Sequence, residues 1–229
     1  MKIHGIGMQI ANNRLTLVLL VVMTLTINAQ HKKTDWAFIV KKEDLHLIGA
    51  DKGLRNLSWF RNEYTFSNMC NASFFTSNNA VGPFMTDIRI KTTNVYRWWW
   101  LGWGCDTAYI SNTPVTNGER HTLKYLVAGT PLLIKNSKLV SKKEMLQSCS
   151  IKFFNRKCPR TAIGILDDKI FIYITKSATI LELQKKMQSF GCSYAINLDG
   201  GGSTFINTAD EQFPAWKKVK RKYPNLLAW

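Results

Sequence analysis

The sequence lacks the ligand pattern of a structural zinc site. It contains no Cys-x-x-Cys pair, and its four histidines are scattered along the chain. Zinc in proteins is held by clustered thiolates and imidazoles at short spacings. We therefore expect no zinc site and no cofactor, although the sequence leaves a divalent cation open.

Acidic residues are scarce in this chain. Only 15 Asp and Glu residues stand against 31 Lys and Arg residues, which gives a formal net charge of +16 at pH 7. Such a field attracts polyanions. Because no nucleic-acid-binding motif is present, we expect phosphate-bearing glycans or lipid head groups rather than nucleic acid. A generally basic surface without a specific partner explains the charge equally well.

Long hydrophobic runs are missing too, with one exception near the N-terminus. Residues 15–27 are apolar and follow the basic Lys2 and Arg14, but this run is short for a membrane span. With Ala29 as the cleavage end, the pattern predicts a signal peptide over residues 1–29 and an exported protein, periplasmic or extracellular. An uncleaved anchor is the alternative. Cleavage would remove those two basic residues and no acidic one, leaving a charge of +14.

No stretch in the middle of the chain resembles a linker. Hydrophobic residues make up 45% of the sequence, which is enough for a sizeable core. We predict one domain over residues 30–229. In an oxidising compartment the five cysteines suggest a Cys149–Cys158 disulfide and, more weakly, a Cys70–Cys105 disulfide.

The apolar patterns predict mostly strands. We expect a hairpin formed by residues 36–40 and 45–48, a strand at 123–128, a hairpin over 132–140 that turns at Asn136-Ser137, and a hairpin over 162–175 that turns at Asp167-Asp168.

One helix is predicted from its caps and its apolar spacing. Thr179 and Glu182 fit a capping box, Gly191 marks the end, and the apolar residues between them share one face. A strand at residues 193–198 follows the helix. The order hairpin, helix, strand favours a mixed α/β (α+β) domain with a mixed β-sheet and flanking helices.

That last strand leads into a carboxylate followed by three glycines. The sequence reads Asp199-Gly200-Gly201-Gly202-Ser203. Three consecutive glycines lose much backbone entropy on ordering, so a functional site explains them better than a turn does. A tight loop between strands is the structural alternative.

Tryptophans gather at Trp98, Trp99, Trp100 and Trp103. Exposed indoles stack on sugar faces, whereas tryptophans at alternating positions more often lie in the core. The basic residues 217–222 likewise have two interpretations, a surface helix packed on the domain or a peripheral contact with an anionic membrane or cell wall.

Four segments together resemble the phosphodiester glycosidase family. These are Asn71-Ala72-Ser73-Phe74-Phe75, Gly129-Thr130-Pro131-Leu132-Leu133, Arg160-Thr161-Ala162-Ile163-Gly164, and Asn197-Leu198-Asp199-Gly200-Gly201-Gly202-Ser203. Their order and approximate spacing agree with the family over residues 36–206. The resemblance implies hydrolysis of a sugar-1-phosphodiester, which releases the sugar and leaves a phosphomonoester.

The resemblance also assigns roles to residues. Asp199 and Arg160 are expected to be catalytic, with Asp199 as base, nucleophile or support for positive charge at the sugar carbon. Arg160 and the backbone amides of residues 200–203 would stabilise the departing phosphate. The expected substrate-binding residues are Asn71, Ser73, Phe74, Thr161, Gly200, Gly201, Gly202 and Ser203.

The sequence also allows a second function class. The positive charge and the tryptophan cluster also suit a non-catalytic protein that binds anionic envelope glycans. Convergence of Asp199, Arg160 and Asn71 in one cleft would favour catalysis, and an Arg160 pointing elsewhere would favour binding.

Overall fold

The computed structural model describes residues 33–50, 53–86, 90–91, 98–214 and 221–229. Residues 34–229 form one compact unit. The predicted signal peptide and most of the basic stretch 217–222 lie outside the described residues. Within the described part, no helix is long and apolar enough to cross a membrane.

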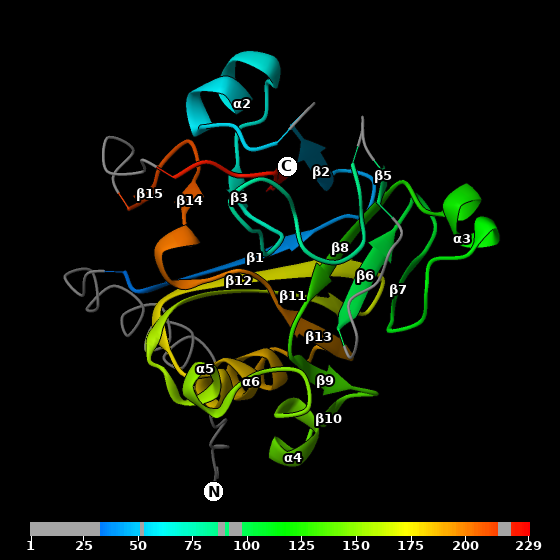
Figure 1. Cartoon of the computed structure of the whole chain (residues 1–229), viewed down its shortest axis with the longest axis vertical. Coiled ribbons are helices and arrows are strands. Elements are labelled where there is room, and N and C mark those ends of the chain that lie inside the picture. The colour runs from blue at the N-terminus through cyan, green and yellow to red at the C-terminus, as the bar shows by residue number, and fades with distance from the viewer. Residues whose placement is uncertain (1–32, 51–52, 87–89, 92–97, 215–220) are drawn as a thin grey trace, which may run out of the picture. The chain divides into compact units, whose positions relative to one another are not determined.

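The largest sheet has six strands and carries most of the core (Figure 1). In spatial order these are β1 (Asp35–Val40), β12 (Lys169–Ala178), β11 (Cys158–Leu166), β13 (Tyr194–Asn197), β9 (Leu132–Lys135) and β10 (Lys138–Leu139). Two smaller sheets complete the domain. One has the order β15 (Gln212–Phe213), β14 (Ile206–Asn207), β3 (Met69–Asn71), β16 (Asn225–Ala228) and β2 (His46–Gly49). The other has the order β5 (Ile90–Lys91), β4 (Phe84–Met85), β8 (Tyr125–Gly129), β6 (Trp99–Trp103) and β7 (Ala108–Ser111).

Every strand pair among the described residues is antiparallel, so the predicted mixed sheet is wrong. The helix after β12 does carry the chain to a strand of the same sheet. However, β12 and β13 lie on opposite sides of β11 and do not pair with each other. The order of hairpin, helix and strand can be predicted from the sequence. The position of β11 between β12 and β13 cannot.

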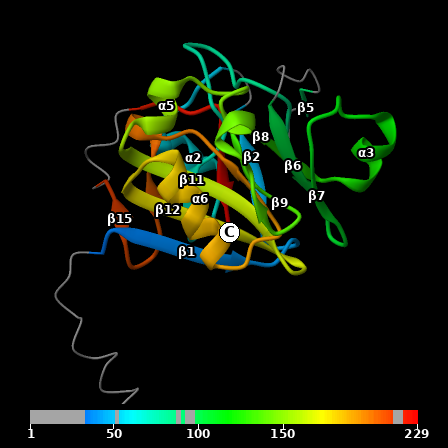
Figure 2. The ribbon, with the colours of Figure 1, turned by 90° about the horizontal axis from the view of Figure 1, so that it is seen from below.

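The described helices are short apart from one. They are α2 (Leu57–Glu63), α3 (Asn117–Thr122), α4 (Lys142–Met145), α5 (Ile151–Asn155) and α6 (Ile180–Ser189). Helix α6 packs on the six-stranded sheet, as Figure 2 shows, so flanking helices are confirmed only for this face.

The predicted helix is confirmed in its caps and its buried face. Both hydrogen bonds of the Thr179–Glu182 capping box are present. Ile180, Leu183 and Met187 are fully buried, and Gly191 has a positive φ of 87°, which ends the helix in a conformation that glycine tolerates.

The predicted hairpins have mixed outcomes. Those over residues 132–140 and 162–175 form as β9–β10 and β11–β12, with positive φ at Asn136, Ser137 and Asp167 in the turns. The predicted hairpin of residues 36–40 and 45–48 is wrong, because β1 pairs with β12 while β2 pairs with β16. The turn between β1 and β2 therefore carries the chain from one sheet to another.

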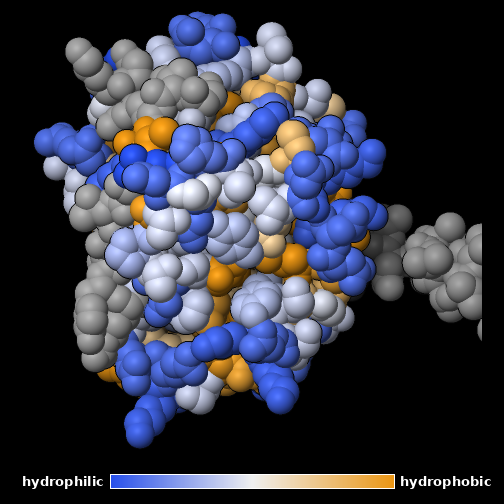
Figure 3. All heavy atoms as spheres, turned by 90° about the vertical axis from the view of Figure 1, so that its right-hand side faces the viewer, coloured by the Kyte–Doolittle hydropathy of each residue, from blue (hydrophilic) through white to orange (hydrophobic). Residues whose placement is uncertain are grey.

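The tryptophan cluster belongs largely to the core. Trp100 and Trp103 are fully buried, and their indole nitrogens donate to the carbonyl oxygens of Thr113 (2.7 Å) and Leu45 (2.8 Å). Trp98 and Trp99 are half-buried. The side of the molecule that carries α3 and β7 is mostly hydrophilic, and hydrophobic atoms show mainly in gaps between polar side chains (Figure 3).

Neither predicted disulfide is present, because all five cysteines are free thiols. Cys70 is buried in β3, whereas Cys105 is exposed after β6 in a different sheet. The Cys149 thiol donates instead to the carbonyl oxygen of Met145 at 3.4 Å. Cys149 and Cys158 are therefore close in sequence without forming a disulfide.

Candidate active site

Asp199 lies where the six-stranded sheet meets the sheet that contains β3. The Leu198 amide donates to the Thr161 carbonyl oxygen at 2.9 Å, which extends the pairing of β13 with β11. One residue later, the Asp199 amide donates to the Ala72 carbonyl oxygen at 3.2 Å, beyond the end of β3. The chain thus changes sheets at the carboxylate.

Asn71 connects three of the four sequence segments singled out above. Its side chain is 1% exposed, and its Oδ1 accepts from the Thr161 hydroxyl (2.7 Å) and the Phe205 amide (3.3 Å). Its Nδ2 donates to the main-chain carbonyl oxygen of Asp199 at 2.6 Å. A buried amide with this many partners holds its neighbours in fixed positions. Asn71 and Thr161 therefore position the Asp199 backbone.

The Asp199 carboxylate is partly buried and hydrogen-bonded within its own turn. Oδ1 accepts from the Gly200 amide at 2.8 Å, and the Ser203 side chain also hydrogen-bonds to the carboxylate. Burial raises the pKa of Asp199 above its ordinary value, while Ser203, Gly200 and the charge of Arg221 oppose that rise. A carboxylate with a raised pKa is suited to accept a proton from water.

The glycines form a short 3₁₀ turn, η1 (Gly201–Ser203). Gly201 has a φ of +61°, which glycine adopts at little cost. Gly200 makes a close approach, because a β-carbon there would lie 2.9 Å from the Pro159 carbonyl oxygen. Two of the four amides expected to bind phosphate are already used, since Gly200 donates to Asp199 and Ser203 donates to the Gly200 carbonyl oxygen. The amides of Gly201 and Gly202 have no acceptor among the described residues.

Arg160 contacts this turn through its aliphatic stem. It follows a register shift in β11, and a β-carbon on Gly200 would lie 3.6 Å from its Cδ. Its guanidinium donates to the carbonyl oxygens of Ala178 (3.2 Å), Phe153 (2.9 Å) and Arg156 (2.8 Å). It also stacks on the Phe153 ring, with Cζ 4.5 Å from the centroid.

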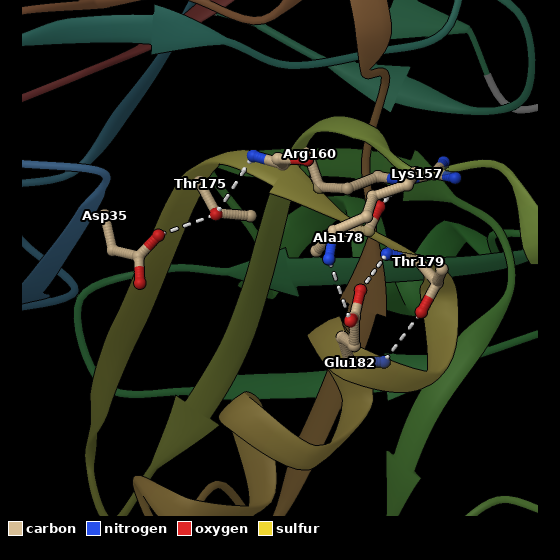
Figure 4. A network of polar contacts seen from close by, with 8 residues as sticks. Asp35, Lys157, Arg160, Thr175, Ala178, Thr179 and Glu182 are labelled. Carbon is tan, nitrogen blue, oxygen red and sulfur yellow. Dashed lines mark hydrogen bonds and ion pairs between the residues drawn. The ribbon is translucent and has the colours of Figure 1, made fainter.

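The guanidinium of Arg160 links the end of α5 to the end of β12. Figure 4 shows it beside the Thr175–Asp35 hydrogen bond, which joins β12 to β1, and the Lys157–Glu182 ion pair at the start of α6. Asn71 and the Asp199 backbone are therefore hydrogen-bonded to each other, whereas the Arg160 guanidinium is bonded to main-chain carbonyl oxygens.

The remaining expected residues lie around the same junction. The Ser73 amide donates to Asn225 Oδ1 at 3.2 Å, and its buried hydroxyl has no partner among the described residues. Phe74 is half-buried and packs edge-on against Trp98, with ring centroids 5.2 Å apart. Phe74 thus belongs to a group of aromatic rings with Trp98 and Phe153.

The structure also brings in residues that sequence reasoning missed. Tyr223 is buried, and its hydroxyl donates to the Ser203 carbonyl oxygen at 3.0 Å. Arg221 lies against the glycine turn, since a β-carbon on Gly202 would lie 3.0 Å from its Nη1. The sequence signal for Arg221 is the basic stretch 217–222, which by itself indicates a surface helix or a peripheral contact with an anionic membrane or cell wall. Among the described residues, no group of three or more His, Cys, Asp or Glu could hold a metal ion.

A scan against protein-family models identifies the class of protein that this fold and junction define. The phosphodiester glycosidase model matches residues 70–228. The chain therefore belongs to the phosphodiester glycosidase family, and the matched region extends beyond residue 206 to the last strand, β16. No curated protein sequence matches the chain significantly.

Solved structures share the fold at low sequence identity. The catalytic domain of zebrafish N-acetylglucosamine-1-phosphodiester alpha-N-acetylglucosaminidase, auto-inhibited by its pro-peptide, matches with a TM-score of 0.67 and 12% identity over 87% of this chain and 89% of that one. A hypothetical protein from Synechocystis matches with a TM-score of 0.69 and 12% identity over 85% and 58%. A putative exported protein from Burkholderia pseudomallei matches with a TM-score of 0.59 and 12% identity over 80% and 70%.

Proposed function

We propose that the protein is an exported phosphodiester glycosidase that hydrolyses a sugar-1-phosphodiester to the free sugar and a phosphomonoester. One observation carries the proposal beyond family membership. Asn71, Thr161 and Asp199 come from three separate segments, yet hydrogen bonds link them in one junction. Such long-range order around a partly buried carboxylate is typical of a catalytic site.

Asp199 is the proposed catalytic group. As a base it takes a proton from water while the water oxygen bonds to the anomeric carbon. The bond from that carbon to the phosphate oxygen breaks, and its electron pair leaves with the phosphate. As a nucleophile, Asp199 instead bonds to the anomeric carbon through a carboxylate oxygen as the phosphate leaves. Water then hydrolyses this glycosyl-enzyme. Because a phosphate leaves readily as an anion, neither route needs a second carboxylate as a strong acid.

The other residues have supporting roles in this proposal. Ser203 orients the carboxylate and phosphate oxygens, and the amides of Gly201 and Gly202 face the departing phosphate. Asn71 and Thr161 position the Asp199 backbone, and Phe74 walls the sugar side. Arg160 supports the turn beneath Gly200.

A panel of sugar-1-phosphodiesters, assayed with and without chelator, tests the function. We expect wild-type protein to release free sugar and Asp199→Asn to lose at least about 100-fold in rate. Asp210→Asn is the matched control, because Asp210 is an exposed carboxylate between β14 and β15. Inversion of the anomeric centre, followed by NMR, would exclude Asp199 as nucleophile and leave the roles of base or charge support, and retention would support it as nucleophile.

A non-catalytic glycan-binding protein is the competing function, favoured by the exported charge of +14 and the engaged guanidinium of Arg160. It predicts salt-sensitive binding of anionic glycan or membrane lipid with no product over time. Absence of turnover across the panel would support this alternative.

Export is the remaining part of the proposal. The predicted signal peptide supports it, and so does the likeness to a putative exported protein. N-terminal sequencing of protein from the periplasm or medium should begin after Ala29. A mature chain that starts at Met1 would contradict cleavage.

A further inference from the structure

Arg221 places a guanidinium beside the glycine turn. Its side chain is exposed, and its Nη1 would lie 3.0 Å from a β-carbon on Gly202, which is also exposed. Its Cζ lies 5.3 Å from the centroid of the Phe75 ring, which the guanidinium can stack on. The cation is therefore held next to the two glycine amides that have no acceptor within the described residues.

The chain on the C-terminal side of Arg221 is anchored to the site. Tyr223 exchanges backbone hydrogen bonds with Arg55, at 2.7 and 2.9 Å, and its hydroxyl binds the Ser203 carbonyl oxygen. Strand β16 begins two residues later and pairs with β3, the strand that ends at Asn71. Arg221 thus lies two residues before a segment that is hydrogen-bonded to the site.

The charges explain why a cation is needed at this point. A phosphodiester carries one negative charge, and an ionised Asp199 carries another, so the two repel unless a positive charge lies nearby. Arg221 is close enough to act electrostatically on the Asp199 carboxylate. Arg160 is less suited to this role, because three of its hydrogen bonds go to main-chain carbonyl oxygens.

We propose that Arg221 binds the phosphate group of the substrate, together with the amides of Gly201 and Gly202. This inference rests on the proposed function and names the residue that recognises the phosphate. A guanidinium presents a planar fork of donors that matches two phosphate oxygens. The missing side chain at Gly202 leaves room for the guanidinium beside the turn.

Direct binding of inorganic phosphate, measured by calorimetry on the full chain, tests the proposal. We expect Arg221→Ala to weaken phosphate binding by roughly 10- to 100-fold, the range for a lost hydrogen bond to a charged group. Arg221→Lys keeps the positive charge but loses the planar fork of donors. Its phosphate affinity should therefore lie between those of wild type and Arg221→Ala. Lys222→Ala removes the same charge from the next residue, which is exposed, and should bind phosphate within about twofold of wild type.

Kinetics on an active substrate provide the second readout. The rise in KM for Arg221→Ala should parallel its loss of phosphate affinity, and Lys222→Ala should leave KM unchanged. Equal phosphate affinity in the two alanine variants would overturn the assignment, and so would undetectable phosphate binding by the wild-type protein.

The two proposals fail in different ways. If the wild-type protein hydrolyses no sugar phosphodiester but binds phosphate through Arg221, the proposed function is wrong and the anion site stands. If it hydrolyses the substrate while Arg221→Ala retains KM and phosphate affinity, only the role of Arg221 is wrong.

Discussion

Replacing Arg160 by methionine separates a framework role from a catalytic one. The side chain is 1% exposed, and its guanidinium binds the carbonyl oxygens of Phe153 and Arg156 at the end of α5 and of Ala178 at the end of β12. Methionine fills much of the same volume but donates no hydrogen bond. The substitution therefore leaves three carbonyl oxygens without their donor.

The magnitude follows from the kind of bonds lost. Each hydrogen bond from a charged donor contributes about 1.5–3 kcal/mol, but the guanidinium no longer has to be desolvated in the variant. Breaking a buried network of this kind typically costs about 3–5 kcal/mol. For a domain of this size, that corresponds to a fall in Tm of roughly 6–20 °C.

Urea and thermal unfolding followed by circular dichroism measure the loss. Arg156→Met is the matched control, because the Arg156 side chain is exposed four residues away, and its unfolding free energy should change by less than about 0.5 kcal/mol. Wild-type stability in Arg160→Met together with lost activity would refute the reasoning. Arg160 would then be the substrate ligand that the sequence motif indicates.

Three further predictions concern the turn and the thiols. Burial raises the pKa of Asp199, so as pH rises the folded protein keeps the carboxyl proton after the unfolded chain has lost it. The free energy of unfolding should therefore fall as pH rises from the ordinary pKa of 3.8 through the raised value. Asp199→Asn should remove this pH dependence and be more stable than wild type at neutral pH. Gly201→Ala should lower the free energy of unfolding by about 1–2 kcal/mol, because Gly201 has a φ of +61°. Gly200→Ala should lower activity as well as stability, because its β-carbon would lie 2.9 Å from the Pro159 carbonyl oxygen. Alkylation in denaturant should label five thiols, and under native conditions exposed Cys105 should react far faster than buried Cys70.

Each of these predictions has an outcome that contradicts it. The Asp199 prediction is wrong if the asparagine variant is less stable than wild type at neutral pH, with Asp210→Asn as control. Equal activity in the Gly200 and Gly201 variants would show that the close approach at Gly200 is unimportant. Fewer than five labelled thiols in the exported protein would mean that a disulfide forms.

The sequence alone determined the features that depend on neighbouring residues. The capping box and apolar spacing of α6 and the turn at Asp167-Asp168 are local, and the structure has both. The four segments with their order also identified the family, which the match over residues 70–228 confirms. Local hydrogen bonds and short-range spacing are sufficient for such predictions.

Only the tertiary structure decided which distant segments become partners. The strand at residues 36–40 could be predicted, but its pairing with β12 rather than β2 could not. The motif around Arg160 could be identified, but not that its guanidinium binds carbonyl oxygens of α5 and β12. Arg221 belongs to no motif and reaches Gly202 only because β16 pairs with β3. Such pairings depend on how the whole core packs, so no short stretch of sequence specifies them.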